Sequence, residues 1–402
     1  MSENRPNSPD GEPQIQIPSH LFGDPAIRKM ATEILPRADR HGGPELSKLM
    51  TSPMITTNVS TRGIGDFPQW LSAERCLLIH RDMVRARVME ERMIKMSKSG
   101  EGYFWIGGPG EEAFNTCLGL QVKKGFGPDF DFLHLKYRAS AVALAMGMPI
   151  LDCVRQMAMT STDPHSMGRN FPGHFAKREW NVIPVSSVIG VQFAVAPGTA
   201  HVQKRHGGDG VTIVVGGESG TAEGDFATCL IWSTRPGNEL PVLIIVMNNG
   251  WGISTQHCSI NACADATQRG KAFGIRGEVV DGNDALASWF ALERGLACCR
   301  RERRPYIIEA RVSRLYGHSS SSGAPRSGEP DCVELFEKRL IASGLLDLGE
   351  IKSRREEAKA EVDAAVAQAM REPKPKPEDV ERHTYAPSEV DQVYPTDYTG
   401  LP

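Results

Sequence analysis

Two buried strands joined by a single crossover constrain this chain more than any other feature of its sequence. The run VTIVV (211–215) leads into a glycine-rich turn, and the run PVLIIVMNN (241–249) follows after one helical stretch (221–235). Runs of this composition are typical of parallel strands that are buried on both faces. Further strand and helix patterns alternate as far as residue 315. The sequence therefore predicts an α/β fold with a parallel sheet flanked by helices.

The whole sequence divides into an N-terminal arm, one α/β domain and a C-terminal tail. Residues 1–68 are rich in Pro, Ser and Gly and predict an irregular N-terminal arm. A long helical pattern follows, with Ser72 as its expected N-cap and Gly100 as its expected stop. We expect the α/β domain to span residues 69–371, and the proline-rich residues 372–402 to form an extended C-terminal tail without a core of its own.

Composition argues against several classes of protein. A net charge of −3 offers no basic footprint for nucleic acid, and no apolar run approaches the roughly 18 residues that span a bilayer. The nine cysteines are scattered without a CxxC pair, which is typical of a reduced protein. The first residues have the pattern of neither a signal peptide nor a transit peptide. We therefore expect a cytoplasmic protein that binds neither nucleic acid nor membrane.

Two polar residues directly follow the two strands. Glu218 and Asn249 have thirty residues between them, which is one crossover unit. Because ligands of open parallel sheets bind beyond the carboxyl ends of the strands, both side chains should lie at one edge. Carboxylate and amide oxygens suit Mg²⁺, and the neighbouring glycines let the backbone approach a phosphate. An ordinary turn with an incidental acid is the alternative, but the paired spacing favours a site for metal and phosphate.

This pair belongs to a longer motif. The stretch GGESGTAEGDF…PVLIIVMNNGWGIST (216–255) resembles the thiamine diphosphate motif, and more closely the alpha subunit of 2-oxo acid dehydrogenases, a family with branched-chain, pyruvate and acetoin enzymes. Further segments follow in the order of that family: GGPGEEAF (107–114), KYRASAVALAMGMP (136–149), MGRNFPGHF (167–175), PVSSVIGVQFAVAPGTA (184–200) and RLYGHSSSS (314–322). The resemblance covers about residues 70–370 and implies the thiamine diphosphate-binding fold.

The resemblance also implies a set of site residues. Glu218, Asn249 and the main-chain carbonyl of Trp251 would hold Mg²⁺. The cofactor would lie among Tyr137, Arg138, Ser187, Val188, Ile189, Gly217, Glu218, Ser219, Gly220, Asn249 and His318. His318 is the expected catalytic residue, with roles in proton handling and in acyl transfer, because imidazole titrates near neutrality. For His174, a structural role is as good an interpretation as a catalytic one.

The implied activity is the decarboxylation of a 2-oxo acid, with a branched-chain substrate favoured. The acyl group would pass to lipoamide on a partner acyltransferase. In this family the glutamate that activates the cofactor lies on a beta subunit, so we expect two alpha chains to assemble with two beta chains. An acetoin or pyruvate dehydrogenase alpha subunit is one alternative, and a non-catalytic paralogue is another. The aromatic stretch EGYFWIGG (101–108) would either wall the substrate pocket or pack in the core.

Several positions depart from the family pattern. Ser219 stands in place of a second glycine, and Met247 stands where branched-chain relatives often have an arginine that contacts the diphosphate. Val191 stands where a threonine of a potassium site is expected, so K⁺ stays an open alternative as a second ion. Ser319 corresponds to a serine that is phosphorylated in animal relatives.

Overall fold

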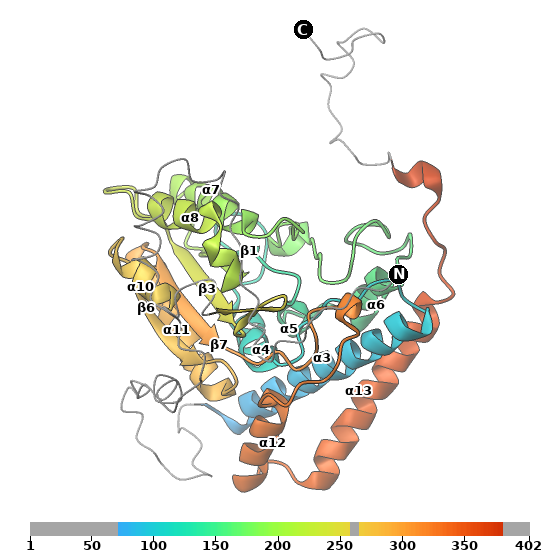
Figure 1. Cartoon of the computed structure of the whole chain (residues 1–402). Coiled ribbons are helices and arrows are strands. Elements are labelled where there is room, and N and C mark those ends of the chain that lie inside the picture. The colour runs from blue at the N-terminus through green and yellow to red at the C-terminus, as the bar shows by residue number, and fades with distance from the viewer. Residues whose placement is uncertain (1–70, 258–264, 381–402) are drawn as a thin grey trace, which may run out of the picture. The chain divides into compact units, whose positions relative to one another are not determined.

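The computed structural model of the chain describes residues 71–257 and 265–380 (Figure 1). The expected N-terminal arm (1–68) lies outside the described residues, as do residues 381–402 of the expected tail. The described residues form an α/β domain around a parallel sheet, as the strand pattern predicts.

The central sheet has five strands in the order β1-β2-β3-β7-β6, and every neighbouring pair is parallel. The strands are β1 (Phe132–His134), β2 (Thr212–Gly217), β3 (Val242–Asn248), β6 (Arg276–Asp281) and β7 (Tyr306–Arg311). A short antiparallel pair, β4 (Trp251–Gly252) with β5 (Thr255–Gln256), follows β3. The parallel register brings the carboxyl ends of β1, β2 and β3 to one edge of the sheet.

Alternate residues of β3 face two separate cores, which explains its unbroken apolar run. Ile244 and Val246 belong to the smaller core, with residues of α7 (Val191–Arg205), α8 (Gly224–Ser233) and α10 (Ala266–Lys271). Leu243 and Ile245 belong to the larger core on the other face. That core includes residues of α4 (Glu112–Gln121), α5 (Ser140–Ala145), α6 (Ile150–Met157) and α11 (Ala285–Glu302).

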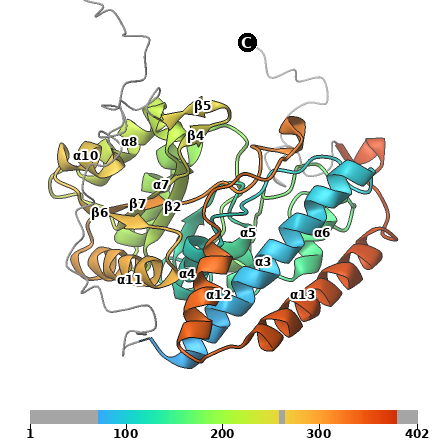
Figure 2. The ribbon, with the colours of Figure 1, turned by 60° about the horizontal axis from the view of Figure 1, so that its bottom comes forward.

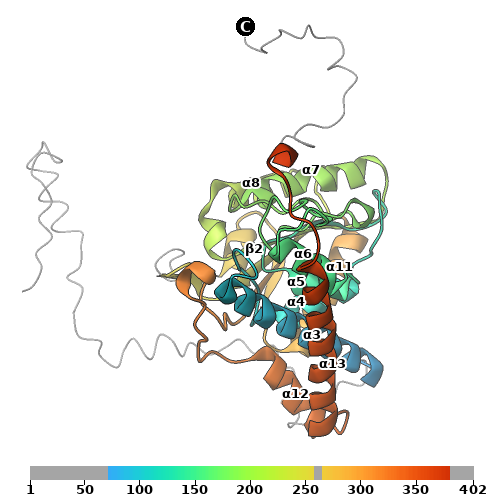
Figure 3. The same cartoon turned by 90° about the vertical axis from the view of Figure 1, so that its right-hand side faces the viewer.

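Three further helices pack on the side of the larger core. They are α3 (Ala73–Ser99), α12 (Cys332–Ala342) and α13 (Leu348–Ala369), and both α12 and α13 contact α3 (Figures 2 and 3). The predicted ends of α3 are confirmed: the Ser72 hydroxyl accepts a hydrogen bond from the Arg75 amide at 3.2 Å, and Gly100 ends the helix in the left-handed region with φ of 79°.

One local expectation is wrong, and one strand has no counterpart in the sequence pattern. The crossover helix after β2 begins at Gly224 rather than at residue 221, because a 3₁₀ turn over Ser219–Ala222 comes first. The three-residue strand β1 has no periodic pattern of its own, and its pairing with β2 becomes visible only in the folded sheet.

Contacts with the domain continue beyond residue 371. The carboxylate of Glu372 accepts hydrogen bonds from the guanidinium of Arg155 at 2.7 and 2.8 Å. The Pro373 carbonyl accepts from the Ser161 amide at 2.8 Å. The start of the proline-rich stretch is therefore held against the end of α6 and the loop that follows it.

The fully buried carboxylate of Asp131 fixes the start of the two neighbouring strands β1 and β2. It accepts hydrogen bonds from the main-chain amides of Val211 at 2.9 Å and Lys123 at 2.7 Å. It also receives two bonds, each of 2.7 Å, from the guanidinium of Arg300 in α11. One acid thus joins the sheet to the helix that covers it.

Replacing Asp131 by alanine should lower the free energy of unfolding by about 3 kcal/mol or more, because it leaves Arg300 without its partner and two main-chain amides, that of Val211 buried, without an acceptor. Chemical denaturation followed by circular dichroism measures the change. Asp129→Ala is the control, since Asp129 is exposed and its loss should cost less than about 0.5 kcal/mol. Equal losses for the two variants would contradict this account.

Candidate functional site

A pocket of about 540 Å³ lies at the carboxyl edge of β1, β2 and β3. Its walls include every site residue expected from the sequence: Tyr137, Arg138, Ser187, Val188, Ile189, Gly217, Glu218, Ser219, Gly220, Asn249, Trp251 and His318. These residues come from five separate segments of the chain, so the fold brings together residues that lie far apart in the sequence. In open parallel sheets, ligand-binding residues usually gather beyond the carboxyl ends of the strands.

Glu218 is the buried acid of this pocket, with an exposed fraction of 2%. Its carboxylate accepts hydrogen bonds from the amide of Asn249 at 3.4 Å and from the hydroxyl of Ser219 at 3.3 Å. The amide oxygen of Asn249 in turn accepts from the Trp251 amide at 3.2 Å. Burial raises the pKa of Glu218, because the charged form loses its hydration. A cation beside this acid would restore the ionised form.

His318 lies in the loop after β7 and is fixed by Arg138. The Nη2 atom of Arg138 donates to the carbonyl of His318 at 3.0 Å and to its Nδ1 at 3.1 Å. Since a guanidinium can only donate, Nδ1 accepts and the proton of the neutral ring lies on Nε2. Burial, together with the smaller effects of the positive charges of Arg138 and Arg314, lowers the pKa of His318 to about 4. The ring is therefore neutral at physiological pH.

The serine-rich segment after His318 forms a 3₁₀ turn (Ser320–Ser322) that is tied to Trp105. The Ser320 amide donates to the Trp105 carbonyl at 2.8 Å, and the Trp105 amide donates to the Ser320 hydroxyl at 3.1 Å. The indole of Trp105 donates to the fully buried carboxylate of Glu90 in α3 at 2.7 Å. Ser319, the expected phosphorylation position, has an exposed fraction of only 4%.

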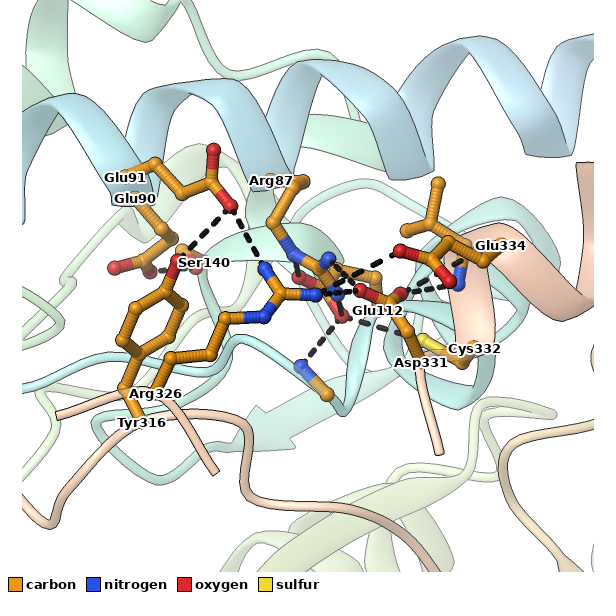
Figure 4. Close-up of polar contacts among 12 residues, drawn as sticks. Arg87, Glu90, Glu91, Glu112, Ser140, Tyr316, Arg326, Asp331, Cys332 and Glu334 are labelled. Atoms are coloured by element: carbon orange, nitrogen blue, oxygen red, sulfur yellow. Dashed lines mark hydrogen bonds and ion pairs between the residues drawn. The ribbon is translucent and has the colours of Figure 1, made fainter. Parts of the chain in front are cut away.

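A buried ion-pair network holds the far end of the same loop against α3 (Figure 4). Arg87 in α3 lies 2.6 Å from the carboxylates of both Glu112 and Asp331. Arg326 pairs with the same oxygen of Asp331 at 3.0 Å, and its side chain lies close to Glu91 and Tyr316. Since Asp331 pairs with Arg87 and the Tyr316 hydroxyl donates to Glu91 at 3.1 Å, the segment from Tyr316 to Asp331 is tied to α3 at both of its ends.

The pocket also contains residues of the aromatic stretch 101–108 and of the segment 167–175. Phe104 and Ile106 line it, whereas Trp105 between them is fully buried. The stretch 101–108 therefore contributes both to the wall of the pocket and to the core. Phe171 packs against Phe104 with ring centroids 4.9 Å apart. His174 lines the pocket as well, and its Nε2 lies 2.7 Å from the hydroxyl oxygen of Ser187.

Among the described residues, no helix is both long enough and apolar enough to cross a membrane.

The fold and the pocket define an α/β protein with a ligand site at the edge of a parallel sheet. The model of the dehydrogenase E1 component family matches residues 80–378, so the chain belongs to that family. This finding agrees with the family that the sequence motifs indicate.

Curated relatives are alpha subunits of 2-oxoisovalerate dehydrogenase. The chain is 31% identical to the mitochondrial alpha 2 subunit of Arabidopsis thaliana over 268 residues, which are 67% of this chain and 55% of that relative. It is 28% identical to the alpha subunit of Bacillus subtilis over 79% of this chain and 97% of that relative. For the alpha subunit of Pseudomonas aeruginosa the identity is 27%, over 90% and 88%. The chain thus spans about half the length of the Arabidopsis relatives that it matches.

Replacing Arg138 by methionine should raise the pKa of His318 above its native value of about 4, because a neighbouring positive charge is lost. The pKa should stay below its ordinary value of 6.5, since burial remains the main cause of the shift. Nitrogen NMR of histidine-labelled protein measures the titration. Arg304→Met, at an exposed surface arginine, is the control and should leave His318 unchanged. A native His318 that titrates near pH 6.5 would refute the account.

Proposed function

We propose that this chain is the alpha subunit of a 2-oxo acid dehydrogenase that decarboxylates a branched-chain 2-oxo acid on thiamine diphosphate. The acyl group would pass to lipoamide on a partner acyltransferase. The observation that carries the proposal is the single pocket that gathers every expected site residue in a member of the dehydrogenase E1 component family. The names of the relatives support a branched-chain substrate.

The donors at the sheet edge fit a Mg²⁺ ion that carries a diphosphate. Glu218 and Asn249 bring a carboxylate and an amide oxygen together, and the Trp251 carbonyl completes the set that this chain would offer. No group of three His, Cys, Asp or Glu side chains in residues 71–257 and 265–380 could hold a metal ion. In the proposed site, water and diphosphate oxygens complete the shell of the ion, which is usual for Mg²⁺.

The remaining residues would bind and orient the reacting groups. Bound thiamine diphosphate supplies a carbon nucleophile and an electron sink for decarboxylation. Ser187, Val188 and Ile189 line one wall, where an aromatic ring can pack. His318 is held so that its Nε2–H is a hydrogen-bond donor, which suits the stabilisation of a developing oxyanion. The apolar side chains of Phe104 and Phe171 suit an aliphatic substrate side chain and exclude water.

Exposed apolar residues at the pocket support a partner chain over its mouth. Val188, Ile189 and Ile253 line the pocket, yet their exposed fractions are 66%, 51% and 63%. Large apolar side chains grouped at a site entrance are typical of a surface that another chain covers. We propose a beta subunit as that partner, in an assembly of two alpha and two beta chains. Val191 brings only an alkyl side chain, so K⁺ is not included in the proposed site.

A cytoplasmic location remains a prediction, and several of the relatives carry mitochondrial names.

Replacing Glu218 by alanine should weaken the binding of Mg²⁺–thiamine diphosphate by about a hundredfold or more, because the ion loses its carboxylate ligand. Isothermal calorimetry of the chain with its partner measures the dissociation constant. Glu223→Ala is the matched control, since Glu223 is an exposed acid that lines the same pocket. Unchanged binding in Glu218→Ala, or an equal loss in both variants, would speak against the proposed metal site.

The chain alone should not decarboxylate 2-oxo acids, whereas co-expression with a beta subunit should restore turnover. A panel of branched-chain 2-oxo acids, pyruvate and acetoin, assayed with an artificial electron acceptor, measures both activity and preference. Turnover of pyruvate or acetoin ahead of the branched-chain acids would replace the proposed substrate. A chain that is active without any partner would overturn the proposed assembly.

A further inference from the structure

Lys136 is a buried lysine that lines the pocket. It follows the end of β1 by two residues and has an exposed fraction of 7%. Its Nζ lies 2.9 Å from the carboxylate of Glu111, which is itself buried. A buried ammonium requires a counter-charge, and Glu111 supplies it. This ion pair accounts for the burial of Lys136 but leaves its place in the pocket lining unexplained.

Lys136 and Glu218, the acid of the proposed metal site, both line this pocket. An ammonium has three N–H donors, and Glu111 is the hydrogen-bond partner that the described residues give it. Lys136 can therefore keep its ion pair with Glu111 and donate to an anion at the sheet edge.

The other cation of the pocket lining is already engaged. Arg138 donates through Nη1 to the carbonyl of Gly107 and through Nη2 to the carbonyl and Nδ1 of His318. Within the described pocket lining, Lys136 and Arg138 are the lysine and arginine side chains. Met247 at the end of β3 is fully buried in the larger core and does not line the pocket. The end of β3 therefore adds no positive charge there.

We propose that Lys136 binds an oxygen of the cofactor diphosphate and is the principal side-chain cation for that group in this chain. The inference rests on the proposed function, because it takes Mg²⁺–thiamine diphosphate as the ligand. A compact ammonium acts on a phosphate as a point charge, and such charge-assisted hydrogen bonds are the stronger ones in proteins. The diphosphate would then connect the loop after β1, which carries Lys136, with the loop after β2, which carries Glu218.

The test measures the dissociation constant of Mg²⁺–thiamine diphosphate by calorimetry on the full chain with its partner. Lys136→Met should weaken binding by about tenfold to a hundredfold, since one charge-assisted hydrogen bond is lost. Lys136→Arg keeps the charge and should stay within a few-fold of the native protein. Inorganic diphosphate with Mg²⁺ serves as a second probe, and Lys136→Met should weaken its binding by a similar factor.

Glu111→Gln separates a ligand role from a structural one. It breaks the same buried ion pair but keeps the ammonium, so thermal stability should fall in both Glu111→Gln and Lys136→Met. Only Lys136→Met should lose affinity for the diphosphate. Native affinity in Lys136→Met, or an equal loss in Glu111→Gln, would overturn the role of Lys136 and leave the proposed function standing. Failure of the native assembly to bind Mg²⁺–thiamine diphosphate would instead overturn the proposed function.

Discussion

The guanidinium of Arg138 is the interaction on which the pocket depends most. It joins three segments that are far apart in the chain: the Gly107 loop, the turn after β1 and the His318 loop after β7. Its exposed fraction is only 4%, so each of these bonds is shielded from water and holds its segment firmly. Loss of this one group would remove the hydrogen bonds that orient the imidazole and its loop, whereas the sheet below would remain intact.

Close packing around Arg138 explains the glycines before α4. A Cβ atom on Gly107 would collide with the carboxylate of Glu90, and one on Gly108 would meet the carbonyl of Arg138 at 2.5 Å. The backbone must therefore pass between a buried acid and the arginine loop with no side chain of its own. The same Glu90 holds Trp105 and Ser140, so α3, this loop and α5 are fixed as one unit. The ion pairs of Arg87 extend that unit to Asp331.

The sequence predicted the parts of the site that lie on regular elements. Glu218 and Asn249 each follow a strongly apolar strand, and strand spacing alone places them at one edge of the sheet. Lys136 could not be found in this way, because β1 has only three residues and no pattern of its own. The tie between Arg138 and His318 depends on side-chain contacts across 180 residues, which no local pattern records. Motif resemblance located both residues but not the bond between them.

The electrostatics of the pocket link these findings to its proposed ligand. Burial raises the pKa of Glu218 and lowers that of His318, so the protein alone disfavours a charge on both. Arg138 and Arg314 add positive charge beside the imidazole, which disfavours its protonation further. An anion bound between Lys136 and Arg138 would offset those charges, and a divalent cation at Glu218 would offset the burial of the acid. A metal diphosphate, the ligand proposed for this site, would supply both charges together.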